Sequence, residues 1–171
     1  MSYQSKYSYP APISETFRKK ERKTLKESQQ YISVKIYIDT NIFIDYFYNR
    51  KDKFRDLGSI AGSILRRTLQ CEFTVHTSTL VIHELSANNN MTVAKKLFPL
   101  LHLRKKLMCV GADEQDILFT EKLCVERSAP FADTLHAVLA RKSGADFLVT
   151  RNVRDFRNLK ELIAVVLPEN L

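Results

Sequence analysis

The sequence predicts an α/β protein, a three-layer α/β/α sandwich around a central parallel sheet of four to five strands. From residue 34 onward, short apolar stretches rich in Val, Ile and Phe alternate with longer stretches of helical periodicity. The apolar stretches show no polar alternation, as expected of strands covered by helices on both faces. Strands alternating with helices in this way form right-handed crossover units, which join parallel strands.

Size and composition fit one folded domain. The chain has 171 residues, of which 44% are hydrophobic and 27% charged, as in an ordinary globular protein. No apolar run approaches the roughly 18–20 residues of a membrane span, and no signal peptide is evident, so we expect a cytoplasmic protein with no membrane contact. The cysteines Cys71, Cys109 and Cys124 are far apart, which favours buried free thiols over a metal or redox site.

The first 33 residues differ from the rest in composition. Residues 1–12 are rich in Tyr, Ser and Pro, which predicts disorder, and Ser14 would cap a helix reaching Tyr31. This helix has one narrow apolar stripe, formed by Phe17, Leu25 and Ile32, suited to docking on the body, on a second subunit or along a nucleic acid. Seven Lys or Arg against three Glu give this segment a net charge of +4, half of the chain's +8. We therefore separate a basic extension, residues 1–33, from a folded domain, residues 34–171.

The folded domain is expected to alternate strands and helices along its whole length. Strands are predicted at Val34–Asp39, Glu72–His76, Leu107–Val110, Asp146–Val149 and Ile163–Val166. Helices are predicted between them, at Ile42–Asn49, Phe54–Leu69, Thr79–Asn88, Thr92–Leu101, Glu114–Arg127 and Asp133–Lys142. The sequence contains no internal repeat.

Four acidic residues stand after strands or in the helices beside them: Asp39, Glu84, Asp133 and Asp155. Ligands of an open parallel sheet bind outside the carboxyl ends of its strands, so these side chains can converge on one edge. Four carboxylates repel one another unless a cation joins them. Oxygen ligands alone suit Mg²⁺ or Mn²⁺.

Each acid also has a purely structural explanation. Asp39 or Thr40 would cap the next helix, and Asp133 would favour a helix N-terminus through the helix dipole. Glu84 would be a surface charge and Asp155 a turn acid. The occurrence of all four in this order favours one common site.

The set resembles the PIN-domain family, and within it the VapC-like toxins and their archaeal relatives. The resemblance spans Lys35 to Leu171 and rests on the stretches IDTNIFID, VIHEL, PFADTLHAVLA, GADFLVTRNVRDF and VVLPENL. It implies that the four acids bind the metal, that Asn41 steadies the first carboxylate or a metal-bound water, and that Thr150 supports the site by hydrogen bonding. Many relatives have an acid where this chain has Asn152, so the fourth acid is placed at Asp155.

The chemistry that fits these residues is metal-assisted phosphodiester hydrolysis. The sequence offers no Ser/His/Asp set, and His83-Glu84 lacks the second histidine of a zinc peptidase motif. The resemblance implies single-stranded RNA as substrate. Basic residues near the acids would hold its phosphates: Arg50, Lys51, Arg151 and Arg154.

Two further polar residues lie one helical turn from these motifs. His136 follows Asp133 by three residues and shares its helix face, which is typical of a packed or supporting histidine. Asp45 lies one turn beyond Asn41 and is interpreted as a solvated helix acid at the rim of the site.

The resemblance favours a toxin ribonuclease that pairs with an antitoxin protein and forms a homodimer. The predicted helical stretches 54–69 and 79–101 carry apolar surface for such a dimer, notably Ile60, Ile64, Leu97 and Leu100. Two alternatives stay open: a housekeeping RNA-processing nuclease, which the N-terminal extension favours, and a catalytically silent RNA-binding protein of the same fold. A haloacid-dehalogenase-type phosphatase is disfavoured because Asn41 replaces the second acid of its DxD motif.

Overall fold

The computed structural model describes residues 33–171, and the predicted fold class is confirmed there. Five parallel strands form one sheet in the order β3-β2-β1-β4-β5. The strands are β1 (Val34–Ile38), β2 (Phe73–Ser78), β3 (Leu107–Val110), β4 (Phe147–Val149) and β5 (Ala164–Val166). The chain passes outward from β1 to β3 and then returns to β4 on the other side of β1, so the strand order reverses between β1 and β4. The predicted disordered start and helix up to Tyr31 lie outside the described residues.

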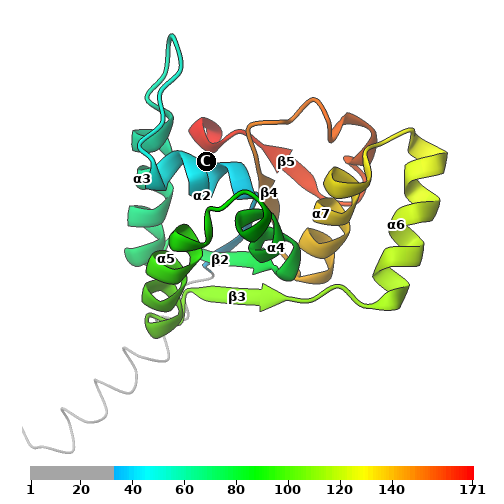
Figure 1. Ribbon diagram of the computed structural model, residues 1–171, viewed down its shortest axis with the longest axis horizontal. Helices are drawn as coiled ribbons and strands as arrows, with labels where there is room; N and C mark the ends of the chain where they lie inside the picture. The colour runs from blue at the N-terminus through cyan, green and yellow to red at the C-terminus, as the bar shows by residue number, and fades with distance from the viewer. Residues whose placement is uncertain (1–32) are drawn as a thin grey trace, which may run out of the picture. The chain divides into compact units, whose positions relative to one another are not determined.

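Six helices connect these strands, and they cover both faces of the sheet (Figure 1). Right-handed crossovers place α2 to α5 over one face and α6 and α7 over the other. The helices are α2 (Thr40–Phe47), α3 (Leu57–Leu69), α4 (Thr79–Ala87), α5 (Met91–Leu103), α6 (Glu114–Arg127) and α7 (Phe131–Lys142). Two 3₁₀ turns, η1 (Arg157–Leu159) and η2 (Pro168–Asn170), flank β5. No helix in residues 33–171 has the length and apolar character needed to cross a membrane.

The second helix of the domain starts later than the sequence predicts. The side chain of Asp52 accepts the backbone N–H groups of Phe54 and Arg55, at 2.8 and 2.7 Å, which folds this segment into a turn. Asp56 then caps α3 by accepting the N–H of Ser59. Phe54 is therefore 85% exposed instead of packed.

The central strand presents different chemistry to the two helical layers. Ile36 and Ile38 are fully buried with one side-chain direction, and Tyr37 points the other way because side chains alternate along a strand. Tyr37 lies opposite His76 of β2, and both contact the α7 layer: Tyr37 bonds His136, and His76 bonds Ser143 at 3.0 Å. The α7 side of the sheet thus carries buried polar groups that lead to the carboxyl ends of the strands.

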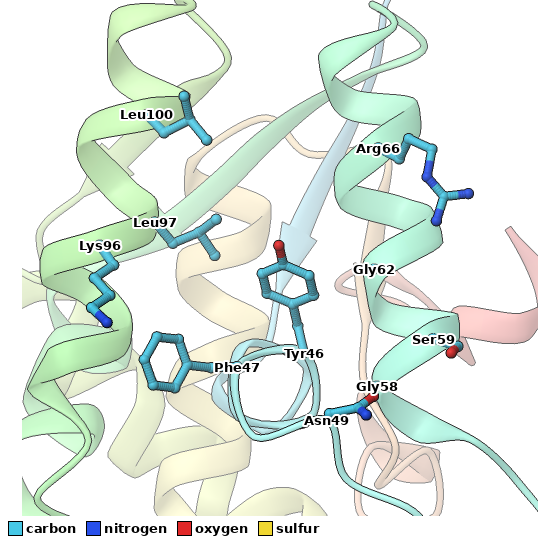
Figure 2. Close-up of a pocket in the computed structure, with 10 residues that line it drawn as sticks. All are labelled: Tyr46, Phe47, Asn49, Gly58, Ser59, Gly62, Arg66, Lys96, Leu97 and Leu100. Carbon is cyan, nitrogen blue, oxygen red and sulfur yellow. The ribbon is translucent and has the colours of Figure 1, made fainter.

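A groove of about 520 Å³ lies between α2, α3 and α5 (Figure 2). Tyr46 stands between α5 and α3, and the ammonium of Lys96 lies 5.5 Å from the centre of the Phe47 ring. Gly58 lets α3 approach the end of α2, because a Cβ at this position would lie 2.6 Å from the Cα of Asn49. The groove has apolar walls and cationic edges, and it contains none of the predicted acids.

Two surface predictions need correction. The cysteines are free but not buried, since Cys71 and Cys109 are exposed and Cys124 is partly exposed. Among the apolar residues expected on a dimer surface, Ile64 and Leu97 belong to the core. Leu100 is 43% exposed. Helical periodicity alone does not show which apolar residues of a helix pack against the sheet and which stay on the surface.

Candidate metal centre

A polar hollow of about 270 Å³ opens at the carboxyl ends of the central strands. Three of the four predicted acids line it, namely Asp39, Glu84 and Asp133. They come from the β1–α2 junction, from α4 and from the start of α7. The remaining lining residues are Thr40, Asn41, Ile44, Arg50, Asn88, His136 and Asn152. The hollow lies beside the point where strand order reverses, the usual ligand position in open parallel sheets.

Asp39 is held by neutral hydrogen-bond donors. It occupies the N-cap position of α2 but its side chain makes no capping bond, so the capping interpretation is wrong. Its Oδ2 instead accepts hydrogen bonds from Asn41 Nδ2 and from Thr150 Oγ1, both at 2.6 Å. Thr150 Oγ1 in turn accepts the backbone N–H of Asn152 at 3.0 Å. These contacts fix the buried carboxylate without neutralising its charge.

Glu84 reaches the hollow from α4 as a half-buried side chain. Its Oε2 accepts a hydrogen bond from the hydroxyl of Thr40 and lies 3.1 Å from His136 Nε2. Burial raises the pKa of Glu84, but the hydrogen bond and charge of His136 outweigh it and hold the pKa below its ordinary value. Glu84 is therefore an ionised group turned into the site, which excludes the surface-charge interpretation.

The protonation of Asp133 is favoured by burial and by neighbouring negative charges. Its pKa is raised above the ordinary value by burial, then by the negative charges of Asp155 and Asp39. Asp155 is exposed and does not line the hollow, whereas Asn152 does. The fourth predicted acid thus acts on the site through its charge on Asp133. A cation bound among these carboxylates would relieve their repulsion.

His136 lies deeper in the hollow than the sequence indicates. It is 2% exposed, its Nδ1 lies 3.0 Å from the hydroxyl of Tyr37, and its Nε2 lies 3.7 Å from Asp39 Oδ1. Burial lowers the pKa of His136, but the hydrogen bond to Glu84 and the charges of Asp39 and Glu84 raise it above the ordinary value. The only sequence signal for this placement is its position one turn beyond Asp133.

The basic residues expected to bind phosphate divide into two groups. Arg151 is only 11% exposed, and its guanidinium pairs with Asp45 at 3.0 Å and with Glu169 at 2.6 Å. Asp45 is buried, not solvated, and also pairs with Arg50 at 3.4 Å. The expectation that Asp45 is solvated is therefore wrong. Arg151 is engaged in ion pairs within the fold, and its role as a phosphate ligand stays a prediction.

The other predicted phosphate ligands stay on the surface. Arg50 is half exposed and lines the hollow despite its pairing with Asp45. Lys51 is exposed and lies 3.6 Å from Asp56. Arg154 is exposed and forms no ion pair with another of residues 33–171. Arg50 and Arg154 are the two arginines of this group that remain accessible to a ligand.

The donor atoms of the hollow fit a divalent cation. One ligand-type atom each from Asp39, Glu84 and His136 lies within 4.8 Å of the others, and Asp133 lines the same hollow. Within residues 33–171, no Lys or Arg pairs with any of these carboxylates. A hard divalent ion bound by carboxylate oxygens would remove the repulsion that raises the pKa of Asp133.

Comparison with known proteins agrees with this architecture. The family profile of the PIN domain matches residues 36–162. A search of curated proteins finds no match.

Solved structures with a similar fold include two VapBC structures and a toxin–antitoxin complex. VapBC2 from Rickettsia felis, bound to a DNA fragment from its promoter, has a TM-score of 0.55 and 18% identity over 78% of this chain and 98% of that one. A toxin–antitoxin complex from Klebsiella pneumoniae has a TM-score of 0.52 and 20% identity over 78% and 97%. VapBC-1 from nontypeable Haemophilus influenzae has a TM-score of 0.53 and 20% identity over 79% and 98%. At these identities the similarity concerns the fold.

Proposed function

The chain belongs to the PIN-domain family, and from that premise we propose that it is a metal-dependent endoribonuclease acting on single-stranded RNA. The observation that carries the proposal is the hollow in which Asp39, Glu84 and Asp133 meet without a compensating Lys or Arg from residues 33–171. A structural role alone gives no reason to gather three carboxylates at one open edge of a sheet. Hydrolysis assisted by a bound cation does.

The proposed ligands are Asp39, Glu84 and Asp133, with Asp155 contributing through its charge and through any water it binds. When bound, Mg²⁺ or Mn²⁺ would activate water and neutralise charge on the scissile phosphate. The chain's own residues orient the ligands: Asn41 and Thr150 fix Asp39 by their hydrogen bonds, and the hydroxyl of Thr40 fixes Glu84. Asn152 holds Thr150 through its backbone N–H. A ligand set fixed in advance loses little conformational entropy when the ion binds.

Substrate phosphates would be held around the rim of the hollow. Arg50 already lines it, and Arg154 is exposed on the segment that follows β4. The basic extension, residues 1–33, adds a net +4. A polyanion fits these charges, since Arg50 lines a negative centre that needs a cation to accept phosphate and the whole chain carries a net +8.

For the biological role we propose a cytoplasmic VapC-like toxin that works with an antitoxin protein and forms a homodimer. Support comes from the similar structures, two of which are named VapBC and one a toxin–antitoxin complex. A housekeeping RNA-processing nuclease is the alternative, supported by the N-terminal extension. Growth arrest on expression, relieved by the product of an adjacent reading frame, supports the toxin. Harmless expression with no such neighbour favours the housekeeping enzyme. Light scattering at tens of micromolar tests the dimer.

The activity itself is tested with labelled RNA and DNA of the same sequence. We expect the full chain to cleave single-stranded RNA with Mg²⁺ or Mn²⁺, to stop with EDTA, and to recover when excess metal is restored. Glu121→Gln is a suitable control, because Glu121 is an exposed acid on α6 outside the hollow. EDTA-resistant cleavage would overturn the metal dependence. Absence of RNA cleavage, with metal binding retained, would favour the silent RNA-binding alternative.

A further inference from the structure

His136 lies inside the hollow, although a metal centre built from carboxylates alone would need no histidine there. Its imidazole lies between two acids of the hollow, with Nε2 3.1 Å from Glu84 Oε2 and 3.7 Å from Asp39 Oδ1. The residue is 2% exposed, so contacts with neighbouring protein groups set the orientation of the ring. A histidine serving only to pack α7 against the sheet would not need to direct a ring nitrogen at both carboxylates.

The separations match those of ligands around one ion. Two donors that each lie about 2.1 Å from a metal are about 3.0 Å apart at a right angle and about 3.4 Å apart at a tetrahedral angle. The two distances from Nε2, 3.1 and 3.7 Å, lie close to this range before any adjustment to an ion. The same three side chains supply ligand-type atoms that lie mutually within 4.8 Å.

The far side of the ring is held as in a metal-bound histidine. Such a histidine normally has its second nitrogen hydrogen-bonded, which sets the tautomer and the ring orientation. Here Nδ1 lies 3.0 Å from the hydroxyl of Tyr37, which lies 2.6 Å from Ser78 Oγ. Burial raises the pKa of Tyr37, so the phenol stays protonated. If Nδ1–H donates to Tyr37 and Tyr37 donates to Ser78, Nε2 carries no proton and presents its lone pair to the hollow.

We propose that His136 Nε2 is a ligand of the metal, which makes the centre a mixed oxygen and nitrogen site that prefers Mn²⁺ to Mg²⁺. The inference rests on the proposed function for the presence of a metal and adds the ligand and the resulting selectivity. Imidazole suits transition metals, whereas Mg²⁺ prefers oxygen ligands and retains its waters. Without an ion, the network adopts its other arrangement, in which Nε2–H donates to Glu84.

Calorimetric titration of the full-length protein with Mn²⁺ and with Mg²⁺ tests the selectivity. In His136→Gln we expect Mn²⁺ affinity to fall about tenfold or more, the usual effect of losing a ligand or its support, and Mg²⁺ affinity to change less than about threefold. His76→Gln is the matched control, a buried histidine on β2 bonded to Ser143 outside the hollow, and should leave both affinities unchanged. An unchanged Mn²⁺/Mg²⁺ ratio in His136→Gln would overturn the inference alone. A wild-type protein that binds neither ion would overturn the proposed function as well.

A measurement on the wild-type protein keeps the test decisive if the variant fails to fold. The ring nitrogens of ¹⁵N-histidine-labelled protein can be followed by NMR with Zn²⁺, a diamagnetic ion that takes the same nitrogen ligand. We expect saturating Zn²⁺ to leave Nε2 of His136 unprotonated and the proton on Nδ1. If Nε2 keeps its proton in the saturated protein, His136 is not a ligand.

Discussion

Two aspartates on the same short segment are both buried, yet their side chains have opposite kinds of partner. Asp39, at the end of β1, accepts hydrogen bonds from the neutral groups of Asn41 and Thr150. Asp45, on α2, is paired with the guanidinium of Arg151 at 3.0 Å and with that of Arg50 at 3.4 Å. Within residues 33–171 no Lys or Arg pairs with Asp39. One carboxylate has two arginine partners within the fold, and the other has neutral hydrogen-bond donors and no Lys or Arg partner among residues 33–171.

The difference separates structural from functional burial of charge. A buried ion pair ties distant segments together: Arg151 follows β4 and also pairs with Glu169 in the last turn of the chain, η2. Asp39 has no arginine or lysine partner in residues 33–171, only Nε2 of His136 at 3.7 Å, and a buried carboxylate in that position is stabilised when a cation binds beside it. Asp39 therefore belongs to the metal centre and Asp45 to the framework behind it.

Replacing Asp39 should abolish catalysis without harming the fold. We expect Asp39→Asn to lower the cleavage rate by several orders of magnitude, because it removes a charged ligand from a shared ion. The metal-free variant should melt at the same temperature or higher, since the change relieves repulsion with Asp133. Single-turnover cleavage and thermal unfolding measure the two effects.

Asp133→Asn should behave in the same way as Asp39→Asn, and Glu121→Gln should match the wild type in both measurements. Full activity in either aspartate variant would contradict the assignment of the hollow as the metal centre. A large loss of stability in Asp39→Asn would mean that the two buried aspartates do not differ as proposed.

Replacing Asp45 should have the opposite profile. Asp45→Asn removes one of the two carboxylates paired with the nearly buried Arg151 and leaves only Glu169. Breaking a buried ion pair typically costs about 3 kcal/mol of folding free energy. Cleavage per folded molecule should stay within about tenfold of the wild type at low temperature, because no metal ligand is changed. Urea unfolding measured beside single-turnover cleavage separates these effects. An Asp45→Asn protein that is stable but inactive would transfer Asp45 to the catalytic site.

The sequence predicts the positions of the acids better than their partners. Asp39 and Asp133 can be placed at one edge because strand ends and helix starts follow from local patterns. The pairing of Asp45 with Arg151 joins residues 106 positions apart, so no local pattern indicates it. A charged residue on a short amphipathic helix looks solvated until the sheet places an arginine against it. Because the sequence does not show this pairing, Arg151 is predicted from the sequence to be free to bind phosphate.

The sequence does not predict how deeply His136 is built into the site, for a related reason. The position of His136 one turn beyond Asp133 suggests a shared helix face, but its hydrogen-bond partners come from β1 and α4. Tyr37 and Ser78 give no sequence signal because a tyrosine in an apolar strand is ordinary core. The fold class can be predicted from periodicity alone, whereas the polar network within it depends on strand order.

The two buried histidines should respond to acid in opposite directions in the metal-free protein. The pKa of His76 is lowered by burial and by Lys35, so its native state binds fewer protons than the unfolded chain, and stability falls as pH drops below about 6.5. The pKa of His136 is raised, so its contribution is present below about 6.5 and is lost as pH rises through the folded value.

Melting temperatures at pH 5.5 and 7.5, taken with EDTA, check this contrast. His76→Gln should be less sensitive to acid than the wild type, and His136→Gln more sensitive. Equal acid sensitivity of all three proteins would show that neither histidine is linked to folding, and the electrostatic difference between the two buried networks would then be confined to the aspartates.

The smallest expected effect concerns where the substrate's phosphates are held. Asp45 forms ion pairs with both Arg151 and Arg50, so few arginines near the hollow are free to bind RNA. Residues 1–32 carry a net charge of +4. A chain starting at Ser33 should fold and bind metal, yet RNA affinity should fall about tenfold. Its salt dependence should flatten by roughly 0.7 in log–log slope for each phosphate that the truncated chain no longer neutralises. Binding titrations at several salt concentrations, with thermal unfolding, test this.

Other outcomes of the same truncation would place the extension differently. A lowered melting temperature or dissociation of the dimer, with an unchanged salt slope, would mean that the stripe of Phe17, Leu25 and Ile32 docks on protein. If neither quantity changes, the extension is passive and the body alone must hold the phosphates. Asp45→Asn would then strengthen RNA binding, because it releases Arg50 from its pairing with Asp45 at the edge of the hollow.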